Sequence, residues 1–160
     1  MKCTPKSWTL RVEKKCTMKK FIEDLSNETG LEVRYFGKAL RNPLSVKYVS
    51  IGNIDPFGFV RSIMNAEYVV TNSFHGIAFS INLNKPFFAE LLVKSSGVNS
   101  RLENILRFTG LESRCIRKDK KVKDYLVNYI DWNIINKKLD EKRIHSISFL
   151  EETIKTGSKF

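Results

Sequence analysis

Cysteine and histidine are scarce in this sequence of 160 residues, which contains three cysteines and two histidines. Cys3, Cys16 and Cys115 lie far apart and form no CxxC pair, so their spacing favours free thiols over a disulfide framework or a zinc site. The two histidines are also widely separated and offer no set of metal ligands. We therefore expect no metal centre and a reducing compartment.

Long apolar runs and the common phosphate-binding motifs are absent as well. No stretch approaches the roughly 18 apolar residues of a transmembrane helix, and residues 1–15 lack the apolar segment of a secretory signal. The sequence contains no GxGxxG, no GxxxxGK followed by Ser or Thr, and no GxSxG. Dinucleotide-binding, P-loop and hydrolase interpretations therefore have no motif support, and we expect a cytoplasmic protein.

Basic residues outnumber acidic residues by 28 to 17, which gives a formal net charge of +11. Almost all of this excess lies in residues 1–20 and 111–160, whereas the middle of the chain is nearly neutral. No nucleic-acid-binding module accompanies the charge, so we expect no nucleic-acid partner. A basic cluster in the second region is expected to be a solvated loop, with an anionic acceptor or a membrane surface as alternatives. It comprises Arg114, Arg117, Lys118, Lys120, Lys121 and Lys123.

Strand and helix patterns alternate along the chain. The strand patterns cover Trp8–Val12, Leu31–Phe36, Val46–Ile51, Glu67–Thr71 and Pro86–Leu91. The helix patterns cover Met18–Thr29, a segment opened by Asp55 and Pro56, a segment from Ser73, Ser100–Gly110, and one long or broken helix over Asp131–Thr156. This alternation predicts an α/β fold, with a parallel sheet and helices on both of its faces.

Periodicity and helix-end signals predict which residues face the core. Asp55 is expected to cap its helix, Ser100 to start a capping box, and Gly30 and Gly110 to end helices. The expected inner faces follow the helical spacing of apolar residues. They comprise Phe21, Ile22 and Leu25; Phe57, Val60 and Met64; Phe74, Ile77, Ala78 and Ile81; and Trp132, Ile135, Leu139, Ile147, Leu150 and Ile154.

The turn after the Glu67–Thr71 strand is the strongest candidate for a ligand site. In open parallel sheets, ligands bind where a strand ends and a helix begins, and the first amides of such a helix favour an anion. Ser73 can either cap the helix or bind a phosphate oxygen, and Gly76 allows close approach to the backbone. His75 is expected to face the mouth of the turn, although a structural role is the alternative.

The stretch Asn65–Gly76 resembles the most characteristic segment of the polysaccharide pyruvyl transferases. The resemblance is dense from Asp55 to Arg114 and looser from Phe21 to Thr156. It implies a Rossmann-like fold similar to the C-terminal domain of a glycosyltransferase-B-type enzyme. It also implies transfer of the pyruvyl group of phosphoenolpyruvate, as a ketal, to a sugar of a cell-surface polysaccharide. Phosphate is the leaving group.

The resemblance implies His75 as the catalytic residue and no cofactor besides the donor substrate, phosphoenolpyruvate. The implied substrate-binding residues are Asn72, Ser73, Phe74, Gly76, Arg101 and Lys85. Lys85 is the weaker candidate, because it precedes a strand and therefore lies at the opposite end of the sheet from the other residues. The acceptor would be a sugar or a lipid-linked saccharide, with attachment to the inner face of the membrane as an open alternative.

Members of this family are about twice as long as this chain, a length typical of two domains. We expect residues 17–160 to form the donor-binding half, residues 1–16 to match poorly, and the chain to be inactive alone. The missing N-terminal domain or a second copy would be its partner. The alternative is a catalytically silent α/β module that binds an anion or a partner. A basic nucleic-acid-binding protein is disfavoured, because the charge lies at the two ends of the chain and no nucleic-acid-binding module accompanies it.

Overall fold

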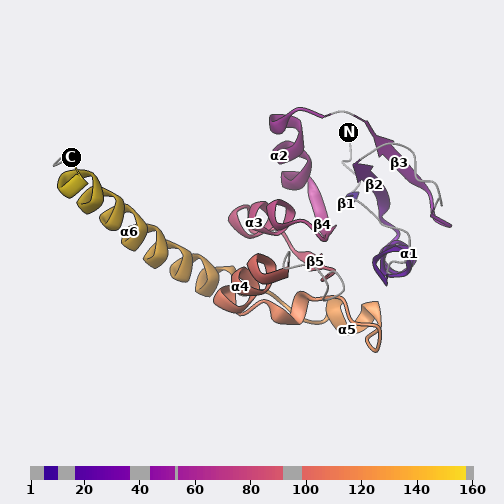
Figure 1. Cartoon of the computed structure of the whole chain (residues 1–160). Coiled ribbons are helices and arrows are strands. Elements are labelled where there is room, and N and C mark those ends of the chain that lie inside the picture. Colours follow the sequence, from indigo (N-terminus) through magenta and orange to yellow (C-terminus); the bar gives the residue numbers. More distant parts are fainter. Residues whose placement is uncertain (1–5, 11–16, 37–43, 53, 92–98, 158–160) are drawn as a thin grey trace. The chain divides into compact units, whose positions relative to one another are not determined.

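A computed structural model describes residues 6–10, 17–36, 44–52, 54–91 and 99–157 of the chain (Figure 1). The chain divides into two compact units, Met1–Tyr129 and Ile130–Phe160. The first unit contains a sheet with helices on both faces, and the second contains a single long helix.

Five parallel strands form the sheet, in the order β3-β2-β1-β4-β5. Their bounds are Lys6–Leu10 for β1, Glu32–Phe36 for β2, Tyr48–Ile51 for β3, Ala66–Thr71 for β4 and Phe87–Ala89 for β5. The structure confirms the predicted α/β fold with a parallel sheet. The predicted strand over Trp8–Val12 overlaps β1, and its last two residues lie outside the described ranges.

Helices follow the strands in the order that a parallel sheet requires. Helix α1 (Thr17–Thr29) lies between β1 and β2 in sequence, α2 (Pro56–Met64) between β3 and β4, and α3 (Phe74–Asn82) between β4 and β5. After β5 come α4 (Asn99–Thr109), the short 3-10 helix η1 (Glu112–Arg114) and α5 (Val122–Leu126). The sequence patterns did not predict η1 or α5, because this segment is rich in charge and too short for helical periodicity.

One face of the sheet is covered by α1 and α5. Phe21 of α1 packs against Phe88 of β5 and Tyr125 of α5, with ring centroids 5.0 Å and 5.3 Å away. Ile22 and Leu25 are buried in the same core, so the predicted inner face of α1 is confirmed. This face holds the larger aromatic cluster of the unit.

The opposite face is covered by α2 and α3, with Ile77 and Ile81 of α3 buried as predicted. The predicted inner face of α2 is wrong at two of its three residues, because Phe57 is 83% exposed and Met64 is 52% exposed, whereas Val60 is half-buried. Phe57 and Met64 are seven residues apart and lie on one side of the helix, whereas Phe59 lies on a different side. The Phe59 ring packs between Phe36 and Phe79, at 5.7 Å from each ring.

Helix ends follow the predicted signals at three of four positions. The Asp55 side chain accepts a hydrogen bond from the Gly58 amide at 2.5 Å, as expected of a cap. Gly30 and Gly110 adopt φ values of +69° and +74°, which favour glycine after a helix. The predicted capping box is wrong, because Ser100 is already the second residue of α4 and cannot occupy the position before the helix.

Helix α6 (Trp132–Gly157) is continuous and makes up the described part of the second unit. Its predicted inner face is buried only at Ile135, while Ile147, Leu150 and Ile154 are 56%, 57% and 73% exposed. A lone helix has no second element in its own unit against which to bury an apolar stripe. Among the described residues, no helix is both long and apolar enough to cross a membrane.

Arg114 differs from the rest of the basic cluster, which was predicted to be a solvated loop. Its side chain is buried, and the guanidinium donates hydrogen bonds to the carbonyls of Tyr125, at 3.5 Å, and Asn128. The guanidinium also lies over the Phe88 ring, 5.8 Å from its centroid. Burial lowers the pKa of Arg114. This arginine therefore belongs to the core, where it holds the end of α5 against the sheet.

Replacing Arg114 with Ala is expected to lower the free energy of unfolding by about 2–3 kcal/mol, because two carbonyls lose their partner and a cavity opens. The matched control is Arg117→Ala, whose exposed side chain should contribute within about 0.5 kcal/mol. Urea unfolding followed by circular dichroism measures both changes. Equal effects of the two substitutions would refute a structural role for Arg114.

Stability is expected to fall as the pH rises above about 9. Burial raises the pKa of the Tyr125 and Tyr68 phenols and of the Cys115 thiol. The unfolded chain therefore releases these protons at lower pH than the folded chain does. As a result, the free energy of unfolding falls as the pH rises. Urea unfolding between neutral and alkaline pH should show this fall. Tyr125→Phe should reduce its slope, whereas the same change at the exposed Tyr129 should not.

Candidate active site

The carboxyl ends of the five strands meet at one edge of the sheet, because all of the strands are parallel. Chain order reverses between β1 and β4, since β2 and β3 lie on one side of β1 and β4 lies on the other. Ligands of open α/β sheets bind at the carboxyl edge beside such a reversal. Asn72 and Ser73 directly follow β4 at this point.

A tight turn connects β4 to α3. Thr71 is fully buried, and its side-chain oxygen accepts a hydrogen bond from the Ser73 amide at 3.0 Å. Ser73 occupies the position before the helix, as predicted, but its hydroxyl makes no hydrogen bond to the helix. The first hydrogen bond of the helix runs from the Ile77 amide to the Ser73 carbonyl. The amides of Phe74, His75 and Gly76 therefore have no carbonyl partner within the helix. These three amides and the Ser73 hydroxyl can thus donate hydrogen bonds to a ligand.

Two ionisable side chains flank this helix start. His75 is exposed on the first turn of α3, and its ring lies edge-on to the Phe74 ring at 5.9 Å between centroids. Arg101 reaches the same place from α4, with its guanidinium carbon 5.7 Å from the centroid of the Phe74 ring. The guanidinium adds a positive charge to the positive end of the α3 dipole. The arrangement favours an anion with two acidic groups.

Glu90 is a buried carboxylate at the same edge of the sheet, and it was missed in the sequence. It directly follows β5, and its side chain accepts a hydrogen bond from the Met18 amide at 3.1 Å. The start of α1 thus already has an anion supplied by the protein, whereas no carboxylate is bonded to the start of α3 among the described residues. A charged residue directly after a buried apolar strand is the only signal that could have revealed it.

A family model described as polysaccharide pyruvyl transferase matches residues 9–89, about half of the chain. The chain belongs to the polysaccharide pyruvyl transferase family. The match runs from β1 to the end of β5 and includes the turn Asn72–Gly76. It begins well before Asp55 and ends before Arg101, so it does not cover the resemblance noted over the following segment, residues 90–114.

A solved structure supports the fold of this pyruvyl transferase family member. The crystal structure described as the glycotransferase of kitacinnamycin is similar, with a TM-score of 0.57 and 11% sequence identity. The similarity covers 92% of this chain and 43% of that chain, so the present chain spans less than half of its length. This level of identity shows the fold alone, which agrees with the predicted glycosyltransferase-B-type architecture. No curated protein matches the chain.

The structure brings together six of the seven predicted site residues of this family member. They are Asn72, Ser73, Phe74, His75, Gly76 and Arg101. Lys85 lies apart from them, because it follows α3 and precedes β5, at the amino edge of the sheet, where its amide donates to the Ser80 carbonyl. The nine residues of α3 span about 13 Å between the two places. A substrate contact of Lys85 stays a prediction.

The groups gathered at the start of α3 are amides, a hydroxyl, an imidazole and a guanidinium, all of which can donate hydrogen bonds to an oxyanion. Among the residues that the structure describes, no group of three or more His, Cys, Asp or Glu side chains is placed to hold a metal ion. Carboxylate, phosphate and phosphate ester are the ligand groups that this donor set suits.

Proposed function

We propose that this chain binds phosphoenolpyruvate at the start of α3 and contributes to the transfer of its pyruvyl group to a sugar as a ketal. The family supports this activity. The observation that carries the assignment of the site is the start of α3, where the Ser73 hydroxyl is not used by the helix and Arg101 approaches from α4.

Phosphoenolpyruvate carries a phosphate and a carboxylate, and the site offers a separate set of donors for each. The amides of the first turn of α3, with the Ser73 hydroxyl, form a compact cradle that suits the phosphate. The planar guanidinium of Arg101 suits the carboxylate, to which it can donate two parallel hydrogen bonds. Phe74 lies beneath this guanidinium and limits its orientations.

The reaction requires a proton on the methylene carbon of the donor. His75 is exposed beside the cradle and is the residue that can supply this proton. Protonation leaves a positive centre on the neighbouring carbon, to which two sugar hydroxyl oxygens bond in turn while the bond to the phosphate oxygen breaks. One hydroxyl proton restores His75 and the other leaves with the phosphate. Donors around the phosphate stabilise its departure.

We assign the chain to the donor side of the reaction. It spans 43% of the similar glycotransferase structure, and enzymes of this architecture bind their two substrates between two domains. The acceptor would be a sugar or a lipid-linked saccharide for exopolysaccharide biosynthesis, in the cytoplasm or at the inner face of the membrane. In this proposal the chain alone binds the donor without completing the transfer.

Isothermal titration calorimetry with phosphoenolpyruvate tests the site. Arg101→Gln is expected to weaken binding at least about tenfold, because a charge-assisted pair is worth 1.5–3 kcal/mol. The matched control is Arg107→Gln on the same helix, which is exposed and should leave binding unchanged. His75→Gln should weaken binding only a few-fold, because its main role is proton transfer.

Two results would contradict the proposal. Equal weakening by Arg101→Gln and Arg107→Gln would indicate general charge attraction instead of a defined site. Equal affinity of the chain for inorganic phosphate and phosphoenolpyruvate would favour the catalytically silent anion-binding module, because such a module needs no partner for the donor carboxylate.

A further inference from the structure

Thr71 is a buried polar residue to which the proposed function assigns no role. It is the last residue of β4, and a hydroxyl in such a place needs a hydrogen-bond partner, because burial removes the water that would otherwise bond to it. The buried hydroxyls of Ser62, Ser80 and Thr109 each donate to the carbonyl four residues earlier in their own helix. The Thr71 side chain instead accepts a hydrogen bond from the Ser73 amide, in the turn that begins the candidate active site.

The backbone of Thr71 is held by the strands on both of its sides. It pairs with Leu10 of β1 and with Ala89 of β5. Its carbonyl accepts a hydrogen bond from the Glu90 amide at 3.0 Å, and the Glu90 carboxylate in turn binds the Met18 amide at the start of α1. The position of Thr71 is therefore fixed relative to β1, β5 and α1.

The Thr71 side chain extends this fixed position to the turn. Because Ser73 is bonded to it at 3.0 Å, the backbone directly before α3 is tied to the end of β4. The amides of Phe74, His75 and Gly76 come directly after this tie, and they are the ones without a carbonyl partner in the helix. An anion gains most from donors that already converge before it binds, since no ordering of the chain then opposes binding.

We propose that Thr71 is a positioning residue of the phosphate cradle. Its side-chain oxygen holds Ser73, so that the three amides that follow converge on one point, and Thr71 itself does not touch the ligand. The Ser73 amide then serves the protein, whereas the next three amides serve the ligand. This inference rests on the proposed function, because the cradle is the one assigned to the phosphate of phosphoenolpyruvate.

The variants Thr71→Val and Thr71→Ser separate the hydroxyl from the packing of the side chain. Val has nearly the same shape as Thr but accepts no hydrogen bond, whereas Ser keeps the acceptor and loses a buried methyl group. In calorimetric titrations, Thr71→Val should weaken the binding of phosphoenolpyruvate and of inorganic phosphate about three- to tenfold, the loss that one hydrogen bond commonly causes. Thr71→Ser should bind both within about twofold of the original chain. A packing role predicts the opposite order, and that order would overturn the proposal.

The matched control is Thr109→Val, which makes the same change at another buried, hydrogen-bonded threonine. Thr109 is 3% exposed and ends α4, at the opposite end of this helix from Arg101. The control should lower the thermal stability of the chain, as Thr71→Val does, but leave the affinity for both anions unchanged. If the two variants weaken binding equally, binding follows overall stability and the proposal fails.

Hydrogen exchange of the isotopically labelled chain gives a readout that needs neither a variant nor a ligand. The Ser73 amide should exchange slowly in the original chain, because Thr71 accepts its hydrogen bond. Phosphoenolpyruvate should slow the exchange of the Phe74, His75 and Gly76 amides and leave that of Ser73 as it is. Fast exchange of the Ser73 amide in the original chain would overturn the inference, even if Thr71→Val does not fold.

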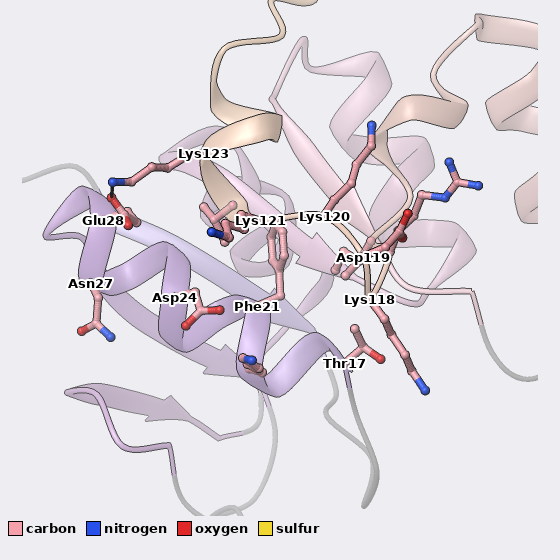
Figure 2. Close-up of a pocket in the computed structure, with 14 residues that line it drawn as sticks. Thr17, Phe21, Asp24, Asn27, Glu28, Lys118, Asp119, Lys120, Lys121 and Lys123 are labelled. Atoms are coloured by element: carbon pink, nitrogen blue, oxygen red, sulfur yellow. Dashed lines mark ion pairs between the residues drawn. The ribbon is translucent and has the colours of Figure 1, made fainter.

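Failure of the proposed function would look different from failure of this inference. A cavity of about 760 Å³ between α1 and residues 116–123 is another place where an anion could collect, although Asp24 and Asp119 line it together with Lys118 and Lys121 (Figure 2). Phosphoenolpyruvate shifts confined to this cavity would contradict the proposed function. The titration with inorganic phosphate would then decide the role of Thr71, and an unchanged phosphate affinity in Thr71→Val would overturn it.

Discussion

Replacing Phe88 with Ala will lower the free energy of unfolding by about 3–5 kcal/mol, the cost of removing a buried phenyl ring. Phe88 is fully buried in β5. Its ring packs edge-on against Phe21 at 5.0 Å and against Tyr125 at 5.7 Å, and it stacks on Tyr68 at 5.7 Å. These partners come from three different elements, so the change removes the contact that joins α1, α5 and the sheet.

The matched control is Phe57→Ala on α2. The Phe57 side chain is 83% exposed, and its loss should change stability within about 0.5 kcal/mol. Urea unfolding of both variants measures the difference; if Phe88→Ala does not fold, thermal unfolding of Phe88→Leu gives the smaller change of the same sign. Equal changes at the two positions would mean that the described packing is incorrect.

Replacing Ser73 with Asp will abolish phosphoenolpyruvate binding, with a loss of at least about 100-fold, while the fold becomes slightly more stable. Asp is among the best residues before a helix, since its carboxylate accepts hydrogen bonds from the first amides and favours the positive end of the dipole. These are the amides that the proposed phosphate needs. The added charge also repels a donor with two acidic groups at close range.

The control for this second prediction is Ser73→Asn, which caps a helix comparably but carries no charge. It should weaken binding less than Ser73→Asp does, because it competes for the same amides without repelling the donor. Thermal unfolding and calorimetric titration of the same samples provide the two readouts. Unchanged phosphoenolpyruvate affinity in Ser73→Asp, with the expected gain in thermal stability, would place the donor elsewhere.

The fold was largely predictable, because strand and helix patterns depend on local periodicity. The phase of a helix was less predictable: in α2, Phe57 and Phe59 are equally apolar, and only packing against Phe36 and Phe79 selects the second. Periodicity also predicts the apolar stripe on α6, but it does not indicate whether another element packs against that stripe. In the basic cluster after Gly110, Arg114 was misjudged, because a buried arginine looks the same in sequence as its exposed neighbours.

The candidate site was predictable where it is local and not where it depends on long-range contacts. The turn at Ser73 was predictable because a strand pattern is followed there directly by a helix pattern. The family match includes this turn. The position of Arg101 over the Phe74 ring depends on how α4 packs. The local sequence pattern does not reveal this packing. The contact between Glu90 and Met18 joins residues 72 positions apart and was invisible for the same reason.

The start of α3 is the proposed binding site of phosphoenolpyruvate. The most direct measurement is a titration of the isotopically labelled chain with phosphoenolpyruvate, followed by amide resonance shifts. Binding at the start of α3 should produce saturable shifts of the Phe74, His75 and Gly76 amides and of the Arg101 side chain, all with one dissociation constant. Shifts confined to Lys118–Lys121, or the absence of any saturable shift, would contradict it.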